Sequence, residues 1–226
     1  MRYFTLFLGL MNLMLPISVY AQTTVSGRVI FEGTAPVVEK VEVKSDTATC
    51  GTSQEIQKLI LGRDKGVANA VVRVIGAQGV LPNQKGSLDQ VSCEFQPHIQ
   101  VIPAGGKLTL TSSDPVLHNA HAFYEDGSTA FNIAVPMAGM EVSTQLKKPG
   151  LIKLRCDAGH TWMSAYILVT EEPFFAMTDT DGNFKIEGVP AGNYEIEVWQ
   201  EWLGSHREPL VVKEGEPASL TIPLKK

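Results

Sequence analysis

The sequence lacks the motifs of common hydrolase and nucleotide-binding sites. Its 226 residues contain no Gly-x-Ser-x-Gly, no His-Glu-x-x-His and no phosphate-binding glycine loop. It also lacks an excess of basic residues, because 19 Lys and Arg stand against 24 Asp and Glu and the formal net charge is −5. A mildly acidic chain has no electrostatic attraction to phosphate backbones, so we expect no nucleic acid among its partners. The sequence thus gives no support to hydrolysis or to nucleic-acid binding.

Long apolar runs are confined to the N-terminus. A basic start precedes a nearly uncharged apolar stretch, residues 3–20, which ends at the small residue Ala21. This pattern predicts a secretory signal peptide over residues 1–21 and a periplasmic or secreted location. A membrane anchor is the alternative, but Asn12 and Pro16 interrupt the run. No later segment approaches the roughly 20 apolar residues of a membrane span, so we expect none after signal cleavage.

Cysteine is scarce, and its count is odd. The three cysteines are Cys50, Cys93 and Cys156. In an oxidising compartment paired cysteines become disulfides, and an odd number leaves one thiol that requires an explanation.

Helical periodicity is weak, and the chain reads as β almost throughout. Short runs rich in β-branched residues, or alternating between apolar and charged residues, occupy 25–31, 70–75, 99–102, 107–111, 166–170 and 194–198. Glycine and proline separate many of these runs, as in all-β sandwiches and barrels, and we expect an all-β fold. Residues 55–62 are predicted as the one short helix, and residues 77–90 as a loop or linker.

The last third of the chain resembles a known family of small domains. The segment 178–198, with Asp181-Gly182 and Pro190-Ala-Gly192, is similar to the second half of a carboxypeptidase regulatory-like domain, a prealbumin-like β-sandwich. Gly27-Arg28-Val29 and residues 68–74 resemble its first half. We infer that residues 24–90 and 171–226 form one such sandwich and that a second domain, residues 91–170, is inserted between them. Insertion at a surface turn is tolerated because the chain ends there lie close together.

Two or three independent β domains in series are the alternative to an insertion. We favour the insertion, because neither flank alone supplies the about seven strands of a usual sandwich.

The inserted segment contains the residues with metal chemistry. Cys156, His160 and Met163 place a thiolate, an imidazole and a thioether within eight residues. Soft sulfur ligands together with imidazole suit copper, and two histidines and a cysteine with a distant methionine form the blue-copper pattern. The stretch 112–121 offers the second histidine, His118.

This segment resembles the cupredoxins, and especially plastocyanin and amicyanin. The matching pieces are an aromatic-x-Pro strand with its glycine turn, a His-Asn-x-His stretch, a Pro-Gly turn leading to the cysteine, and a closing strand, at 95–110, 118–123, 148–156 and 164–169. The arrangement is also similar to bacterial plastocyanin-like proteins of the methylamine-utilisation type. The resemblance implies a Greek-key β-sandwich that holds copper through His118, Cys156, His160 and Met163. It also implies electron exchange through an exposed edge of His160.

The ligand loop departs from the cupredoxin pattern. Three residues separate Cys156 from His160, where amicyanin and plastocyanin have two. The spacing equals part of the binuclear copper A motif, but that centre needs a further cysteine where Ile152 stands. We therefore expect a mononuclear site, in which the longer loop leaves the distance of Met163 from the metal open.

Other polar residues near the predicted site have secondary roles. His118 and His121 are an odd number of positions apart and point to opposite faces of a strand, so only one of them faces the metal. Asn119 is expected to brace the thiolate loop. His98 and His121 stay possible additional ligands. Met137 and Met140 are expected to pack, with a transient Cu(I) contact as the alternative.

The copper interpretation leaves Cys156 as the free thiolate, and the cupredoxin ligand set makes Cys50 and Cys93 the natural disulfide pair. That bond would tie the N-terminal sandwich to the inserted domain, and it requires a Cα separation below about 7 Å.

Three functions follow from these features. The first is one-electron transfer by a type 1-like copper site to a redox partner protein, which makes the chain a carrier and not an enzyme. The second is copper storage or delivery, and the third is a non-catalytic β-sandwich binding module.

Overall fold

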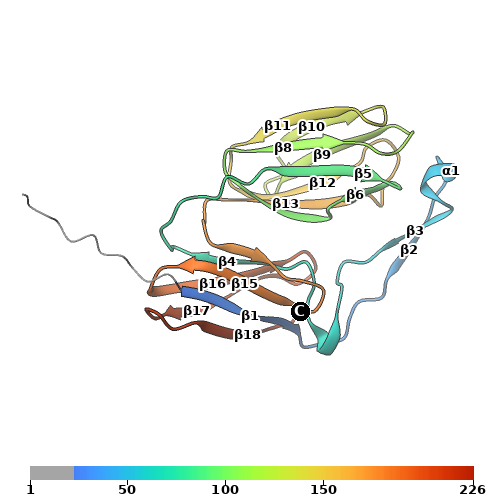
Figure 1. Ribbon diagram of the computed structural model, residues 1–226. Coiled ribbons are helices and arrows are strands. Elements are labelled where there is room, and N and C mark those ends of the chain that lie inside the picture. Colours follow the sequence, from blue (N-terminus) through green and yellow to red (C-terminus); the bar gives the residue numbers. More distant parts are fainter. Residues whose placement is uncertain (1–22) are drawn as a thin grey trace, which may run out of the picture.

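The computed structural model describes residues 23–226, and the predicted signal peptide lies outside the described residues. Figure 1 shows two β-sandwiches, one above the other, with a thin arm of chain alongside. The fold is all-β, as predicted, and the only helices of residues 23–226 are one of four residues and a 3-10 turn of three. Among these residues no helix is long and apolar enough to cross a membrane.

Strands from both ends of the described chain form the lower body, here called the terminal sandwich. One sheet has the order β15-β1-β18 and the other β14-β4-β16-β17. Their strands are β1 (Thr23–Phe31), β4 (Val71–Ile75), β14 (Phe175–Met177), β15 (Asn183–Val189), β16 (Gly192–Gln200), β17 (Gly204–Val212) and β18 (Ala218–Leu224). Alternate residues of these strands point inward, and Val29, Val72 and Ile196 are fully buried in the core between the sheets.

Strands from the middle of the chain form the upper body, here called the central sandwich. A five-stranded sheet of order β10-β9-β12-β13-β7 faces a four-stranded sheet of order β11-β8-β5-β6. The strands are β5 (Gly86–Val91), β6 (Glu94–Gln96), β7 (Ile99–Pro103), β8 (Gly106–Thr111), β9 (His118–Tyr124), β10 (Thr129–Val135), β11 (Glu141–Leu146), β12 (Gly150–Arg155) and β13 (Ser164–Thr170). Leu108, Leu110 and Ile152 fill the core between the two sheets.

Strand β5 corrects the expectation that residues up to 90 belong to a loop or to the terminal sandwich. Gly86 to Leu88 pair in parallel with residues 108–110 of β8 in the central sandwich. The inward-facing residues of β5 are Gly86, Leu88 and Gln90, none of them β-branched. Gln90 is buried because its side-chain amide donates to the Thr111 carbonyl at 2.8 Å. A strand with a polar inward residue does not show the usual apolar alternation.

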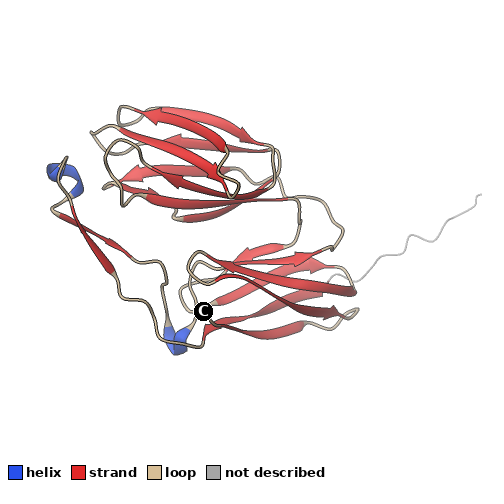
Figure 2. Cartoon of the chain, turned by 180° about the vertical axis from the view of Figure 1, so that it is seen from behind, coloured by secondary structure: helices blue, strands red, loops and turns tan. Residues whose placement is uncertain are grey.

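The arm consists of residues 32–62, which leave the terminal sandwich after β1. It contains β2 (Glu39–Glu42) and β3 (Ser53–Ile56), paired antiparallel, with helix α1 (Thr47–Cys50) at its tip. Figures 1 and 2 both show this tip beside the end of the central sandwich. The helix predicted over 55–62 is wrong, because Glu55 and Ile56 pair with Lys40 and Glu39 in the arm.

A disulfide fastens the arm to the central sandwich. It joins Cys50 of α1 to Cys93, with a Cα separation of 5.2 Å. Val43 of the arm is also buried in the core of the central sandwich. The arm is therefore anchored at its tip by a covalent bond and by apolar contacts.

The two sandwiches meet over a small apolar interface. Val71 and Trp199 of the terminal sandwich share a buried cluster with Val101 and Leu168 of the central one. Together with the disulfide-bonded arm, this interface connects the two bodies at two separate places.

Candidate metal centre

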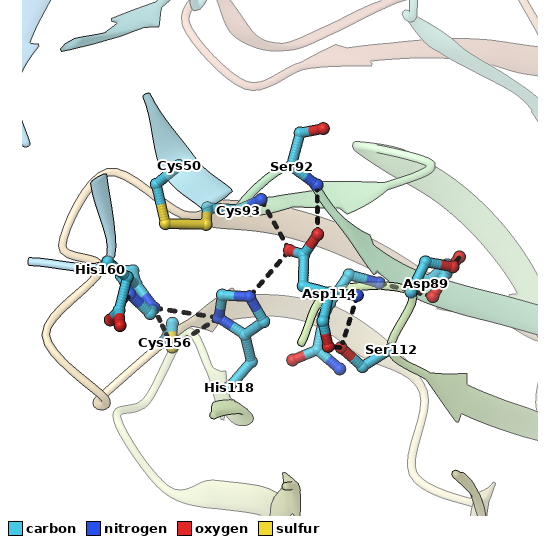
Figure 3. A network of polar contacts seen from close by, with 12 residues as sticks. Cys50, Asp89, Ser92, Cys93, Ser112, Asp114, His118, Cys156 and His160 are labelled. Atoms are coloured by element: carbon cyan, nitrogen blue, oxygen red, sulfur yellow. Dashed lines mark hydrogen bonds and ion pairs between the residues drawn. A yellow bond between two sulfur atoms is a disulfide. The ribbon is translucent and has the colours of Figure 1, made fainter. Parts of the chain in front are cut away.

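Three donor side chains meet at one end of the central sandwich. His118 is the first residue of β9, while Cys156 and His160 lie just after β12 in the loop to β13. The Cys156 Sγ atom lies 3.9 Å from His118 Nδ1 and 3.7 Å from His160 Nδ1, and the two Nδ1 atoms are 2.9 Å apart. Figure 3 shows the two rings and the sulfur turned toward one another. Neighbouring antiparallel strands thus bring together residues 38 and 42 positions apart.

The donors are shielded from water. Both histidines are 0% exposed and Cys156 is 4% exposed. Met163, the fourth predicted ligand, is 2% exposed, and its backbone N–H donates to the His160 carbonyl at 3.0 Å. The loop therefore turns back on itself and keeps the thioether in the same buried core as the thiol.

Each imidazole has a carboxylate behind it. His118 Nε2 lies 2.9 Å from Asp114 Oδ2, and His160 Nε2 lies 2.9 Å from Asp46 Oδ2. A carboxylate only accepts hydrogen bonds, so both Nε2 atoms are assigned as N–H donors. In a neutral ring the other nitrogen, Nδ1, then has an unprotonated lone pair. Burial, the largest influence, lowers the pKa of His118; the hydrogen bond to Asp114 opposes this, the nearby His160 adds to it, and the net shift is downward.

This arrangement allows the cluster to hold a cation. The two Nδ1 atoms are 2.9 Å apart, so they either share a proton in a hydrogen bond or direct their lone pairs to a bound cation. The thiol beside them adds a soft donor that binds metals as the thiolate. Two imidazoles, a thiolate and a nearby thioether match copper better than calcium or magnesium, which prefer oxygen ligands. The residues present therefore fit a copper ion.

The disulfide and Asp114 form part of the support for His118. Asp114 Oδ2 also accepts from the Cys93 backbone N–H at 2.8 Å, and its Oδ1 accepts from the Ser92 N–H at 2.7 Å. Both residues have left-handed backbone, with φ of 52° and 61°, which turns their N–H groups toward one carboxylate. Trp162 adds a donor bond from Nε1 to the Cys93 carbonyl at 3.0 Å.

The sequence analysis missed both carboxylates. Asp114 had a possible signal, because it stands four residues before His118 within residues 112–121. Asp46 had none, because it lies 114 positions from His160 and reaches it only through the arm.

Asn119 contacts the loop that contains the thiol. Its side-chain oxygen accepts from the Asp157 backbone N–H at 2.6 Å, and its amide donates to Asn132 at 2.8 Å. Asp157 directly follows Cys156, so this bond fixes the direction in which the loop leaves β12.

The two additional histidines lie outside the cluster. His98 contacts the Ser164 carbonyl at 3.0 Å and Glu201 of the terminal sandwich at 2.6 Å. His121 points to the other face of β9 and contacts Asp157 at 2.5 Å. Neither belongs to a ligand group found among residues 23–226.

Two expectations about the surroundings of the site are wrong. Met137 and Met140 do not pack inside, since they are 65% and 39% exposed in the turn between β10 and β11. The edge of His160 is not exposed either, because the ring is fully buried and its outer nitrogen contacts Asp46 of the arm.

No family model matches the chain, and no curated protein matches it either. Solved structures similar to part of it include a purple cupredoxin from Nitrosopumilus maritimus, at 21% identity over 38% of this chain and 100% of that one, with a TM-score of 0.33. Amicyanin from Paracoccus versutus shows 14% identity over 44% and 97%, with a TM-score of 0.34. A copper-containing nitrite reductase from Thermus scotoductus SA-01 shows 22% identity over 43% and 24%, with a TM-score of 0.33.

Proposed function

We propose that this chain is an exported one-electron carrier with a single type 1-like copper ion, bound by His118, Cys156, His160 and Met163. The observation that supports this most is the convergence of two imidazole Nδ1 atoms on a buried thiol. When bound, copper supplies one-electron chemistry by alternating between its two oxidation states. Because the site makes and breaks no bond in a substrate, the proposed role is that of a carrier and not of an enzyme.

The chain's own residues would keep the site nearly unchanged between the two states. His118 and Cys156 lie at the ends of adjacent strands of one sheet, and Asp114 and Asp46 hold the two rings. The burial of the donors excludes water from competing for the metal. A rigid, dry site of this kind requires little rearrangement during electron exchange.

The proposed carrier acts with a redox partner protein in the periplasm or outside the cell. The Cys50–Cys93 disulfide supports export, because such bonds persist in oxidising compartments. The partner does not touch His160 directly, since that ring is covered by the arm.

Copper storage is a second candidate function, and the closed site favours it over delivery. Both rings are fully buried, so a bound ion would exchange slowly with an outside acceptor. A protein that delivers its ion needs ligands that an acceptor can reach.

The domain division is part of the proposal. Residues 23–75, apart from the arm, and residues 171–226 would form one carboxypeptidase regulatory-like sandwich that accepts the copper domain as an insertion. The pairing of β1 with β18 and of β4 with β16, which joins both ends of the described chain, supports this.

Copper(II) binding to the mature protein tests the proposed function. We expect an intense thiolate-to-copper band in the visible spectrum, with a matching electron paramagnetic resonance signal, and loss of both in Cys156→Ala. His206→Ala, which removes a histidine of β17 outside the site, is the control and should keep the band. An ordinary type 2 signal that survives Cys156→Ala would contradict the type 1 assignment. Stoichiometric Cu(I) binding without a coloured oxidised form would favour storage.

A further inference from the structure

The tip of the arm brings one acidic side chain to the metal site. Asp46 lies directly before α1, and its Oδ2 atom is 2.9 Å from His160 Nε2. The two residues are 114 positions apart, so this contact exists only because the arm crosses from one sandwich to the other.

Three features hold Asp46 in place. Its backbone is left-handed, with φ 54° and ψ 30°, and its carbonyl accepts from the N–H groups of Thr49 and Cys50 at 2.9 and 2.8 Å. The disulfide from Cys50 to Cys93 then anchors this turn to the central sandwich. Gln54 of β3 strengthens the tip, because its amide donates to the Cys50 carbonyl at 2.6 Å.

The side chain of Asp46 is not used to cap the helix. An aspartate before a helix usually accepts from a backbone N–H of the first turn. Within the described part of the chain, the Asp46 carboxylate makes no such bond to α1. The carboxylate contacts His160 Nε2 instead, while 40% of its side chain stays exposed to solvent.

We propose that Asp46 is a positioning residue for His160 and that the disulfide-bonded arm exists to place it there. This rests on the proposed copper site. By accepting from Nε2–H, the carboxylate selects the ring form whose Nδ1 lone pair faces Cys156. When copper is bound, the negative charge of Asp46 would favour the more highly charged oxidised ion. Carboxylates behind metal-bound histidines orient the ring and raise its basicity.

Two substitutions separate the hydrogen bond from the charge. Asp46→Asn keeps an acceptor oxygen and tolerates left-handed backbone, but it removes the charge. Asp46→Gly also tolerates that backbone, and it removes both. Glu55→Gln is the matched control, because Glu55 is an exposed carboxylate on β3 of the same arm.

The first test uses the full-length mature protein loaded with copper. We expect the reduction potential to rise in both Asp46 variants and to stay at the wild-type value in Glu55→Gln. Competition with bicinchoninate should show Cu(I) affinity about 10- to 100-fold weaker in Asp46→Gly. Unchanged potentials and affinities in correctly folded Asp46 variants would overturn the proposal, as would an equal shift in Glu55→Gln.

The second test needs no metal. Nitrogen-15 NMR of the apoprotein should find His160 protonated at Nε2 in the wild type and in Asp46→Asn, and a mixture of the two ring forms in Asp46→Gly. A single Nε2–H form in Asp46→Gly would refute the positioning role. The copper function and the positioning role of Asp46 can fail separately. Absence of a thiolate-to-copper band in the wild type would contradict the copper function. The ring form of His160 in the apoprotein would still decide the role of Asp46.

Discussion

The strongest structural prediction concerns Asp114, which connects His118 to the arm's disulfide. Its carboxylate is buried and accepts from three donors, the N–H groups of Ser92 and Cys93 and the Nε2–H of His118. A buried donor that loses its acceptor costs about 1–3 kcal/mol. Asp114→Ala removes the acceptor from all three, so we expect unfolding free energy to fall by at least about 3 kcal/mol.

Urea unfolding of the apoprotein measures this loss without any contribution from a metal. Slopes for small proteins are about 1–3 kcal/mol/M in urea, so the midpoint should fall by roughly 1 M or more with the slope unchanged. Asp114→Asn should lose less, because one acceptor oxygen remains. Glu125→Ala, at an exposed carboxylate directly after β9, is the control and should change little. A loss below about 1 kcal/mol in Asp114→Ala would refute the shared-acceptor argument.

Three further predictions follow from neighbouring contacts. Replacing Cys50 and Cys93 by serine opens a loop of 43 residues. Chain entropy predicts that the free energy of unfolding, measured by heat or urea, falls by about 4 kcal/mol. An unchanged midpoint would show that the disulfide adds no constraint. Burial lowers the pKa of His98, but the hydrogen bond and charge of Glu201 outweigh burial and raise the pKa overall. The His98–Glu201 pair should therefore stabilise the protein fully below pH 6.5, and this stabilisation should be lost as the pH rises through the raised pKa. The pH dependence must vanish in His98→Gln if the pair is its cause. His121→Ala should keep the thiolate-to-copper band, because the ring lies on the other face of β9, and loss of the band would mean that His121 is a ligand.

The features predicted correctly from the sequence are mainly those that depend on residues close together in the chain. Alternation and β-branching indicated many of the strands, and the odd cysteine count together with the Cys156–Met163 loop indicated the candidate donors. Strand parity separated His118 from His121, and the structure places them on opposite faces of β9. These features depend on residues close together in the chain, so their signals survive in the sequence.

The features that were predicted wrongly or not at all depend on contacts between segments far apart in the chain. The 55–62 helix was wrong because Glu55 and Ile56 gain backbone partners from β2, which outweighs their weak helical preference. Strand β5 was not predicted from the sequence, because the polar residue Gln90 is buried only where the Thr111 carbonyl accepts a hydrogen bond from it. The exposed edge of His160 was expected from relatives, and no pattern near residue 160 shows that a segment from residue 46 would cover it.

The arm also gives a physical reason for joining the two sandwiches in one chain. An isolated central sandwich, residues 86–170, would retain His118, Cys156, His160 and Met163 but would lack both Asp46 and Cys50. Its His160 would then lose the acceptor that selects its ring form, and Cys93 would be left as a second thiol beside the site. Two thiols near a copper ion invite oxidation to a wrong disulfide or binding in a wrong geometry. The arm therefore contributes one carboxylate and one sulfur to the proposed metal centre, although the core of the terminal sandwich lies apart from that site.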